Sequence, residues 1–239
     1  MSLHDKSKNQ PISIYSFPRS GTHWLAYLVY SCFFNDVKQD NKLDEQNGIT
    51  FFSQHGLSNS CVWMFLIEGH WYHPQCAPHG IKRAVYIERE PKDVMVSIWN
   101  LTLSIAKANG KHQPTFSEFL RSPLKGRVER NYIPPSTASY ILSVPLLWYW
   151  SNLAWKETDV LVVKYENLLT DYKKELNRIQ QTMQLKKLGN VDPTKMVGVN
   201  PGQFPKTNKW KQYFSPDDLA YIDECEKIAQ SIPRKVPKE

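Results

Sequence analysis

Short apolar runs alternate along this chain with stretches of helical periodicity, and this alternation restricts the fold more than any other feature. Strands separated by helices form a parallel sheet, because the chain must cross back before the next strand begins. The runs are continuously apolar, as in strands buried on both faces. The pattern therefore predicts an α/β protein with a central parallel β-sheet flanked by helices. Expected strands are 12–17, 49–53, 61–67, 84–88 and 159–164, and expected helices are 22–33, 92–107, 145–155, 169–184 and one that starts at Pro216 after the N-cap Ser215.

The chain length fits one domain, which we expect to span residues 1–239 with a flexible N-terminus over residues 1–10. A content of 41% hydrophobic and 13% aromatic residues excludes a disordered protein. Two segments, 105–137 and 185–209, are rich in Pro, Gly, Lys and Asn. We expect both to be loops that face a ligand.

The charge balance favours an anionic ligand, because 30 Lys and Arg against 23 Asp and Glu give a formal net charge of +7. The basic residues are spread out, so a nucleic-acid partner is not expected. The four cysteines lack the spacing of a zinc finger or a disulfide framework, which predicts reduced thiols in a cytoplasmic protein and no metal. With no apolar run of eighteen residues, no membrane segment is expected in this chain.

Residues 17–24, FPRSGTHW, join an apolar run directly to a helical pattern. A strand that turns straight into a helix leaves backbone N–H groups pointing out of the helix N-terminus, where the helix dipole also favours an anion. Gly21 lets the backbone approach a ligand, Ser20 and Thr22 offer hydroxyls, and Arg19 adds a cation. The alternative is an ordinary capped turn. The combination indicates a phosphate site.

This stretch is not the loop of nucleoside-triphosphatases, which requires G-x-x-x-x-G-K-[ST]. No Gly stands five positions before Gly21 and no Lys follows it. Metal-assisted phosphoryl transfer is therefore disfavoured.

Four blocks resemble the PAPS-dependent sulfotransferase family, of the cytosolic type, in the order that the family has them. FPRSGTHWLAYL resembles its 5′-phosphosulfate loop, and AVYIEREPKDVMVSIWN resembles its 3′-phosphate motif. WYWSNLAWKETDVLVVKYENLLTDYKKELNRI resembles the following helix, strand and Tyr-Glu-[DN] turn, and NKWKQYF resembles its C-terminal W-K-x-x-F element. The resemblance spans most of residues 12–214 and implies the P-loop-like sulfotransferase fold.

The resemblance implies a binding site for 3′-phosphoadenosine 5′-phosphosulfate (PAPS) and its product PAP. Arg19 matches the Lys or Arg that binds the 5′-phosphate and its bridging oxygen, where Arg cannot act as a general acid. Trp24 is either the face on which adenine stacks or a core aromatic. The residues implied at the 5′ end are Arg19, Ser20, Gly21, Thr22, His23 and Trp24.

At the other end of the donor, the resemblance implies that Arg89 and Ser97 hold the 3′-phosphate, with the family's spacing of eight positions kept. Tyr165 matches the residue that approaches the adenosine, with a buried structural Tyr as the alternative. Lys206 is expected to supply charge at the 3′-phosphate, with Lys209 as its alternative, because the usual Arg-Lys-Gly is absent here.

A general base is implied at His70, nineteen positions before Arg89. His55 is the rival and His73 a third candidate, and Glu68 either orients His70 or ends a strand. An ordinary polar role is the alternative for each histidine.

The reaction implied is transfer of a sulfuryl group from PAPS to a hydroxyl or amine, with in-line attack, a base and positive charge at the leaving phosphate. Arg19 and His70 would be the catalytic residues. The alternatives are a PAP-binding protein without activity and a nucleotide kinase of related architecture. A small molecule or a glycan is expected as acceptor, in a pocket built by the segments 105–137 and 185–209. Its candidate lining residues are His112, Phe116, Tyr132, Tyr140 and Trp148. The oligomeric state is left open.

Overall fold

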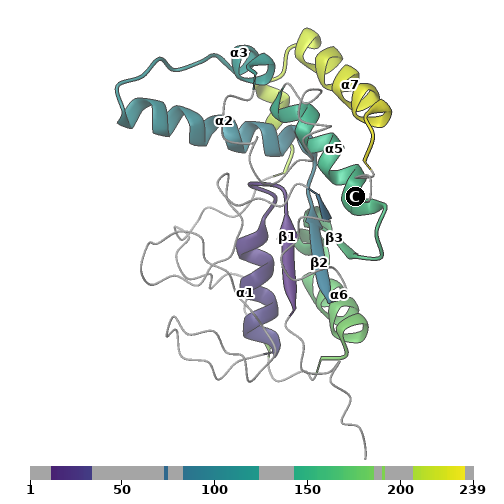
Figure 1. Ribbon diagram of the computed structural model, residues 1–239. Coiled ribbons are helices and arrows are strands. Elements are labelled where there is room, and N and C mark those ends of the chain that lie inside the picture. Colours follow the sequence, from purple (N-terminus) through teal and green to yellow (C-terminus); the bar gives the residue numbers. More distant parts are fainter. Residues whose placement is uncertain are drawn as a thin grey trace, which may run out of the picture.

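Three parallel strands form a sheet in the computed structural model of this protein (Figure 1). The strands are β1 (Ser13–Ser16), β2 (Ala84–Glu88) and β3 (Leu161–Lys164), hydrogen-bonded in the order β1-β2-β3. The structure describes residues 12–33, 73–74, 83–123, 143–185, 190–191 and 207–234. All three described strands were expected, and their parallel pairing confirms the α/β prediction. The expected strands 49–53 and 61–67 lie outside the described residues.

All five helices that the periodicity predicted are present, with differences at some of their ends, and two short helices were not expected. They are α1 (Thr22–Phe33), α2 (Pro91–Ala108), α3 (Phe116–Arg121), α5 (Val144–Lys156), α6 (Tyr165–Met183), the short 3₁₀ helix η4 (Lys209–Gln212) and α7 (Pro216–Ser231). None of these helices is both long and apolar enough to cross a membrane.

Strand β2 is covered on both faces, which explains its continuous apolar sequence. Val85 and Ile87 lie in a cluster with apolar residues of α1 and α6. Tyr86, on the opposite face, stacks on Trp155 at the end of α5, with ring centroids 5.1 Å apart. The strand's twofold alternation thus assigns its side chains to two separate packing layers.

A second group of helices lies beyond the carboxyl end of the sheet in Figure 1. Helices α2, α3, α5 and α7 share one apolar cluster, in which Met95, Leu120, Trp150 and Ile222 are almost fully buried. Phe116 and Trp148 also belong to this cluster, at 7% and 4% exposure. The structure therefore corrects the expectation that these two side chains line an acceptor pocket, because they pack in the core instead.

Helix α3 overturns the expectation that residues 105–137 form a loop throughout. Its N-cap Thr115 accepts a hydrogen bond from the backbone N–H of Glu118, whose side chain in turn accepts one from the N–H of Thr115. This capping box stabilises a short helix inside a segment of polar composition. The pattern T-x-x-E before apolar residues was the sequence signal for it.

Helix α6 starts earlier than the expected 169–184 and is kinked. Asp171 has non-helical backbone angles (φ −153°, ψ 74°), and its side chain accepts a hydrogen bond from Lys174 N at 3.0 Å. Asp171 thus caps the longer second part of the helix, which is the part that the periodicity detected.

Replacing Asp218 by Ala is expected to lower the free energy of unfolding by about 2 kcal/mol, because the buried partners of this carboxylate lose their acceptor. Asp218 is 1% exposed and joins α7 to α3 by accepting hydrogen bonds from Ser117 and Arg121, besides Ser215 at its own helix start. Urea unfolding measures the loss. Asp217→Ala, at an exposed position in the same turn, is the control and should change little.

The same contacts make this contribution depend on pH. Burial raises the pKa of Asp218, but hydrogen bonds from Arg121, Ser215 and Ser117 outweigh burial, and the pKa falls below its ordinary value. Because the native pKa is lowered, the stabilisation is complete above the unfolded-state pKa of about 4 and disappears as the pH falls through the native pKa. The difference between the wild type and Asp218→Asn should thus shrink on going from pH 7 to pH 3. A difference that grows in acid would contradict this assignment.

Candidate functional site

Two residues of the loop between β1 and α1 have positive φ angles. Arg19 has φ 65° and Gly21 has φ 99°, while Ser20 N bonds back to the Phe17 carbonyl at 3.2 Å. An ideal Cβ on Gly21 would lie 2.4 Å from Cδ2 of Tyr165, so only glycine fits there. The first N–H groups of α1, which have no partner inside the helix, therefore open onto a tightly shaped turn.

Hydroxyl groups surround this turn. The Ser16 and Thr22 side chains are hydrogen-bonded to each other across it. Ser20 is fully buried at 0% exposure, and its Oγ has no hydrogen-bond partner among the described residues. A buried hydroxyl without a partner is costly, and an anion at the helix N-terminus would satisfy it. The turn has the chemistry of a phosphate site.

The sheet brings the two expected phosphate-binding motifs into direct contact. Arg19 Nε donates to Ser97 Oγ in α2 at 3.0 Å, although 78 residues separate them. Arg89, which directly follows β2, donates from its guanidinium to the Arg19 carbonyl at 3.0 Å. Burial, and after it the neighbouring charge of Arg89, lowers the pKa of Arg19 from its ordinary value. Neither Arg19 nor Arg89 forms an ion pair with a carboxylate of the described residues, and two cations held so close together favour a multiply charged anion.

Tyr165, the first residue of α6, contacts Arg89 and Trp24. The Arg89 guanidinium lies over its ring, 4.5 Å from the centroid, and the Trp24 ring meets it edge to face at 5.6 Å. Tyr165 is 2% exposed and Trp24 is 7% exposed, so both pack in the core that α1 and α6 share. The contact of either ring with an adenosine stays a prediction.

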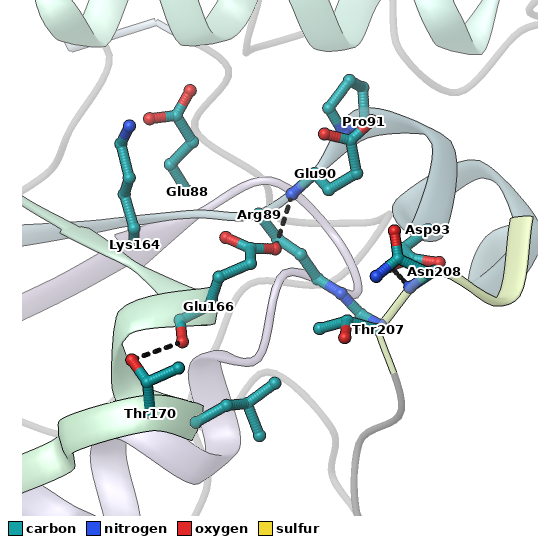
Figure 2. Close-up of a pocket in the computed structure, with 11 residues that line it drawn as sticks. Glu88, Arg89, Glu90, Pro91, Asp93, Lys164, Glu166, Thr170, Thr207 and Asn208 are labelled. Carbon is teal, nitrogen blue, oxygen red and sulfur yellow. Dashed lines mark hydrogen bonds between the residues drawn. The ribbon is translucent and has the colours of Figure 1, made fainter.

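A pocket of about 530 Å³ opens at the carboxyl ends of β2 and β3, with Arg89 in its wall (Figure 2). Ligands of α/β proteins bind at this edge of the sheet. Glu166 Oε1 accepts a hydrogen bond from Glu90 N at 3.0 Å and joins the two strand ends. Thr207 and Asn208, from the segment expected to face a ligand, also line the pocket.

The C-terminal W-K-x-x-F element packs against the start of α2. The buried carboxylate of Asp93 accepts hydrogen bonds from Asn208 N at 2.8 Å and Trp210 N at 3.3 Å, and Lys92 Nζ lies 5.1 Å from the centre of the Trp210 ring. Lys209 is exposed in η4, next to these contacts. Sequence reasoning missed Glu166, which joins the ends of β2 and β3, and Asp93, which holds the C-terminal element against α2. Their signal was a carboxylate one or four positions after a matched motif residue.

Several expected site residues stay predictions. His70, His55 and Lys206 lie outside the described residues, and so does the His23 side chain. His73, the third candidate base, is 3% exposed, stacks on Trp150 and bonds to the Arg234 carbonyl at 2.6 Å, as a structural histidine does. Burial lowers the pKa of His73 despite that hydrogen bond.

Comparison with known proteins identifies the family of this chain. The family model of the sulfotransferase domain matches residues 9–194, well over half of the chain. This chain belongs to the sulfotransferase domain family. The loop, Arg89 and Ser97 all lie inside the matched region of this sulfotransferase-family chain.

Two similar proteins give the family context. A WSCD family member of Aedes aegypti is 26% identical over 187 residues, which make up 74% of this chain and 51% of the relative. The chain thus spans about half the length of that relative. The crystal structure of mouse sulfotransferase SULT7A1 complexed with PAP matches with a TM-score of 0.51 at 18% identity, covering 93% of this chain and 87% of that one. At this identity the match shows a shared fold.

Proposed function

We propose that this sulfotransferase-family chain transfers a sulfuryl group from PAPS to an acceptor hydroxyl or amine. The observation that carries the proposal is the contact of Arg19 with both Arg89 and Ser97, because it joins the two motifs that would hold the two phosphate ends of one donor. The structural relative bound to PAP supports the same ligand. A small molecule or a glycan is the proposed acceptor.

The residues of the turn fit the 5′ end of this donor. The buried Ser20 hydroxyl and the first N–H groups of α1, including those of Thr22 and His23, would donate to the 5′-phosphate. PAPS supplies an activated sulfuryl group, whose bond to the 5′-phosphate oxygen breaks as the acceptor bonds to sulfur. Arg19 would stabilise the charge that develops on that oxygen without giving up its own proton. The acceptor proton would go to His70, and no metal is needed to balance the charge.

The 3′ end would be held by Arg89 and Ser97, with Lys206 as a further cation. Arg89 presents a planar guanidinium at the strand end, which suits two oxygens of one phosphate. Recognition at this end would distinguish PAP from adenosine 5′-phosphate, since the two differ by the 3′-phosphate alone.

Isothermal titration without metal tests the proposal, with PAP, adenosine 5′-phosphate and ATP as ligands. We expect the wild type to prefer PAP. Arg89→Ala should lower the affinity for PAP by about 30-fold, which is about 2 kcal/mol. The affinity for adenosine 5′-phosphate should stay nearly unchanged. The control is Arg83→Ala at the opposite end of β2, where the guanidinium bonds to the Met183 carbonyl at 2.9 Å.

Two outcomes would contradict the proposed function. Equal losses for both nucleotides in Arg89→Ala would refute the 3′-phosphate role of this residue. A wild type that binds ATP with Mg²⁺ and turns it over would indicate a nucleotide kinase instead.

A further inference from the structure

The Tyr165 ring contacts several residues of the proposed site. One face lies under the Arg89 guanidinium at 4.5 Å, and the Trp24 ring meets it at 5.6 Å. Its edge also closes the space beside Gly21, where an added Cβ would come within 2.5 Å of Cε2. With 2% exposure, Tyr165 offers almost no surface to a bound base.

The ring contact restricts the position of the Arg89 guanidinium, because a cation over an aromatic face is attracted to it and its Cζ lies 4.5 Å from the ring centroid. The NH1 group uses one edge to donate to the Arg19 carbonyl at 3.0 Å. Arg89 Nε is buried and has no partner among the described residues. This Nε–H donor is therefore left for an anion.

The hydrogen bond to the Arg19 carbonyl matters because Arg19 has a left-handed backbone conformation. A non-glycine residue at φ 65° is strained by about 1 kcal/mol or more, and surrounding contacts must hold it. The hydrogen bond from Arg89 is such a contact. Tyr165 thus acts on the 5′-phosphate turn through Arg89, as well as directly against Gly21.

Burial, opposed in part by the charge of Arg89, raises the pKa of Tyr165 to about 12. The ring is therefore neutral near pH 7, and its attraction to Arg89 is that of a cation above an aromatic face. Phenylalanine would keep this attraction, whereas an aliphatic side chain would remove it.

We propose that Tyr165 is a positioning residue whose aromatic face holds the Arg89 guanidinium against the Arg19 turn, with the Arg89 Nε left to bind the 3′-phosphate of a 3′,5′-bisphosphorylated nucleotide. Selectivity for the 3′-phosphate then depends on the ring of Tyr165 and not on its hydroxyl group. The inference rests on the proposed function, and it assigns to Tyr165 a role other than contact with adenosine.

The test compares Tyr165→Phe with Tyr165→Leu by titration with PAP and with adenosine 5′-phosphate. The readout is the ratio of the two dissociation constants, because a general loss of stability would lower the affinity for both ligands alike. We expect Tyr165→Phe to keep the wild-type ratio and Tyr165→Leu to lower the preference for PAP about tenfold. Tyr165→Met, which also lacks an aromatic face, replaces Tyr165→Leu in the comparison if that variant does not fold.

Leu168→Ala is the matched control, since Leu168 is 1% exposed in the same helix and cluster. It should lower the melting temperature while the ratio stays as in the wild type. An unchanged ratio in Tyr165→Leu, or a ratio lowered equally in Tyr165→Phe, would overturn the inference alone. A wild type with no preference for PAP would overturn both the inference and the proposed function.

Discussion

Replacing Gly21 by Ala is expected to lower turnover by about 10²-fold, the effect of misplacing a reacting group by about 1 Å. Gly21 has φ 99°, and a Cβ there would meet Cδ2 and Cε2 of Tyr165 at 2.4 and 2.5 Å. Because Tyr165 is held by Trp24 and Arg89, the turn must move instead of the ring. Movement of the turn displaces Arg19 and the N–H groups of α1. The free energy of unfolding should also fall, by about 1–3 kcal/mol.

Gly110→Ala separates the backbone effect from the steric one. Gly110 follows α2 with φ 60°, and no atom of the described residues lies within 4 Å of an added Cβ. This control should lose stability by about 1 kcal/mol and keep its affinity for PAP. Steady-state turnover, titration with PAP and thermal unfolding of the two variants measure the difference. Wild-type affinity and turnover in Gly21→Ala would mean that the turn does not hold the nucleotide.

Replacing His70 by Ala is expected to lower turnover by about 10²- to 10⁴-fold, the usual contribution of a general base. The expectation rests on the position of His70, nineteen residues before Arg89 and shortly after the expected strand 61–67. A base acts on the acceptor proton and not on the donor, so the affinity for PAP should not change. Turnover and titration on the same variant measure both quantities.

His55→Ala is the matched variant, because His55 also follows an apolar run. Loss of turnover in His55→Ala with full activity in His70→Ala would move the base to His55 and leave the proposed function intact. His73→Ala should lower the free energy of unfolding and leave the turnover of the folded protein unchanged, since the His73 ring packs on Trp150. PAP binding without turnover in the wild type, over a broad set of acceptors, would support a binding protein without catalysis.

Helices and strands of this protein were predictable where burial follows the chain periodically. Strand β2 matched residues 84–88 and α1 matched 22–33, because continuous apolar residues or a helical stripe can each be buried in few ways. The N-cap Ser215 with Pro216 correctly marked the start of α7. Helix α3 was missed because its capping box lies in a stretch whose composition resembles a loop, and packing of Phe119 and Leu120 in the core supplied the rest.

By itself, the sequence determined the order of strands and helices, the α/β class and the strand–turn–helix that forms the candidate phosphate site. These follow from local periodicity, turn residues and hydroxyl or charged side chains at strand ends. Only the tertiary structure decided that Arg19 bonds to Ser97, that Arg89 holds the Arg19 carbonyl, and that Tyr165 lies between Arg89 and Gly21. The physical reason is that a parallel sheet brings the carboxyl ends of distant strands to one edge, whereas the partner of each side chain there depends on register and on the packing around it.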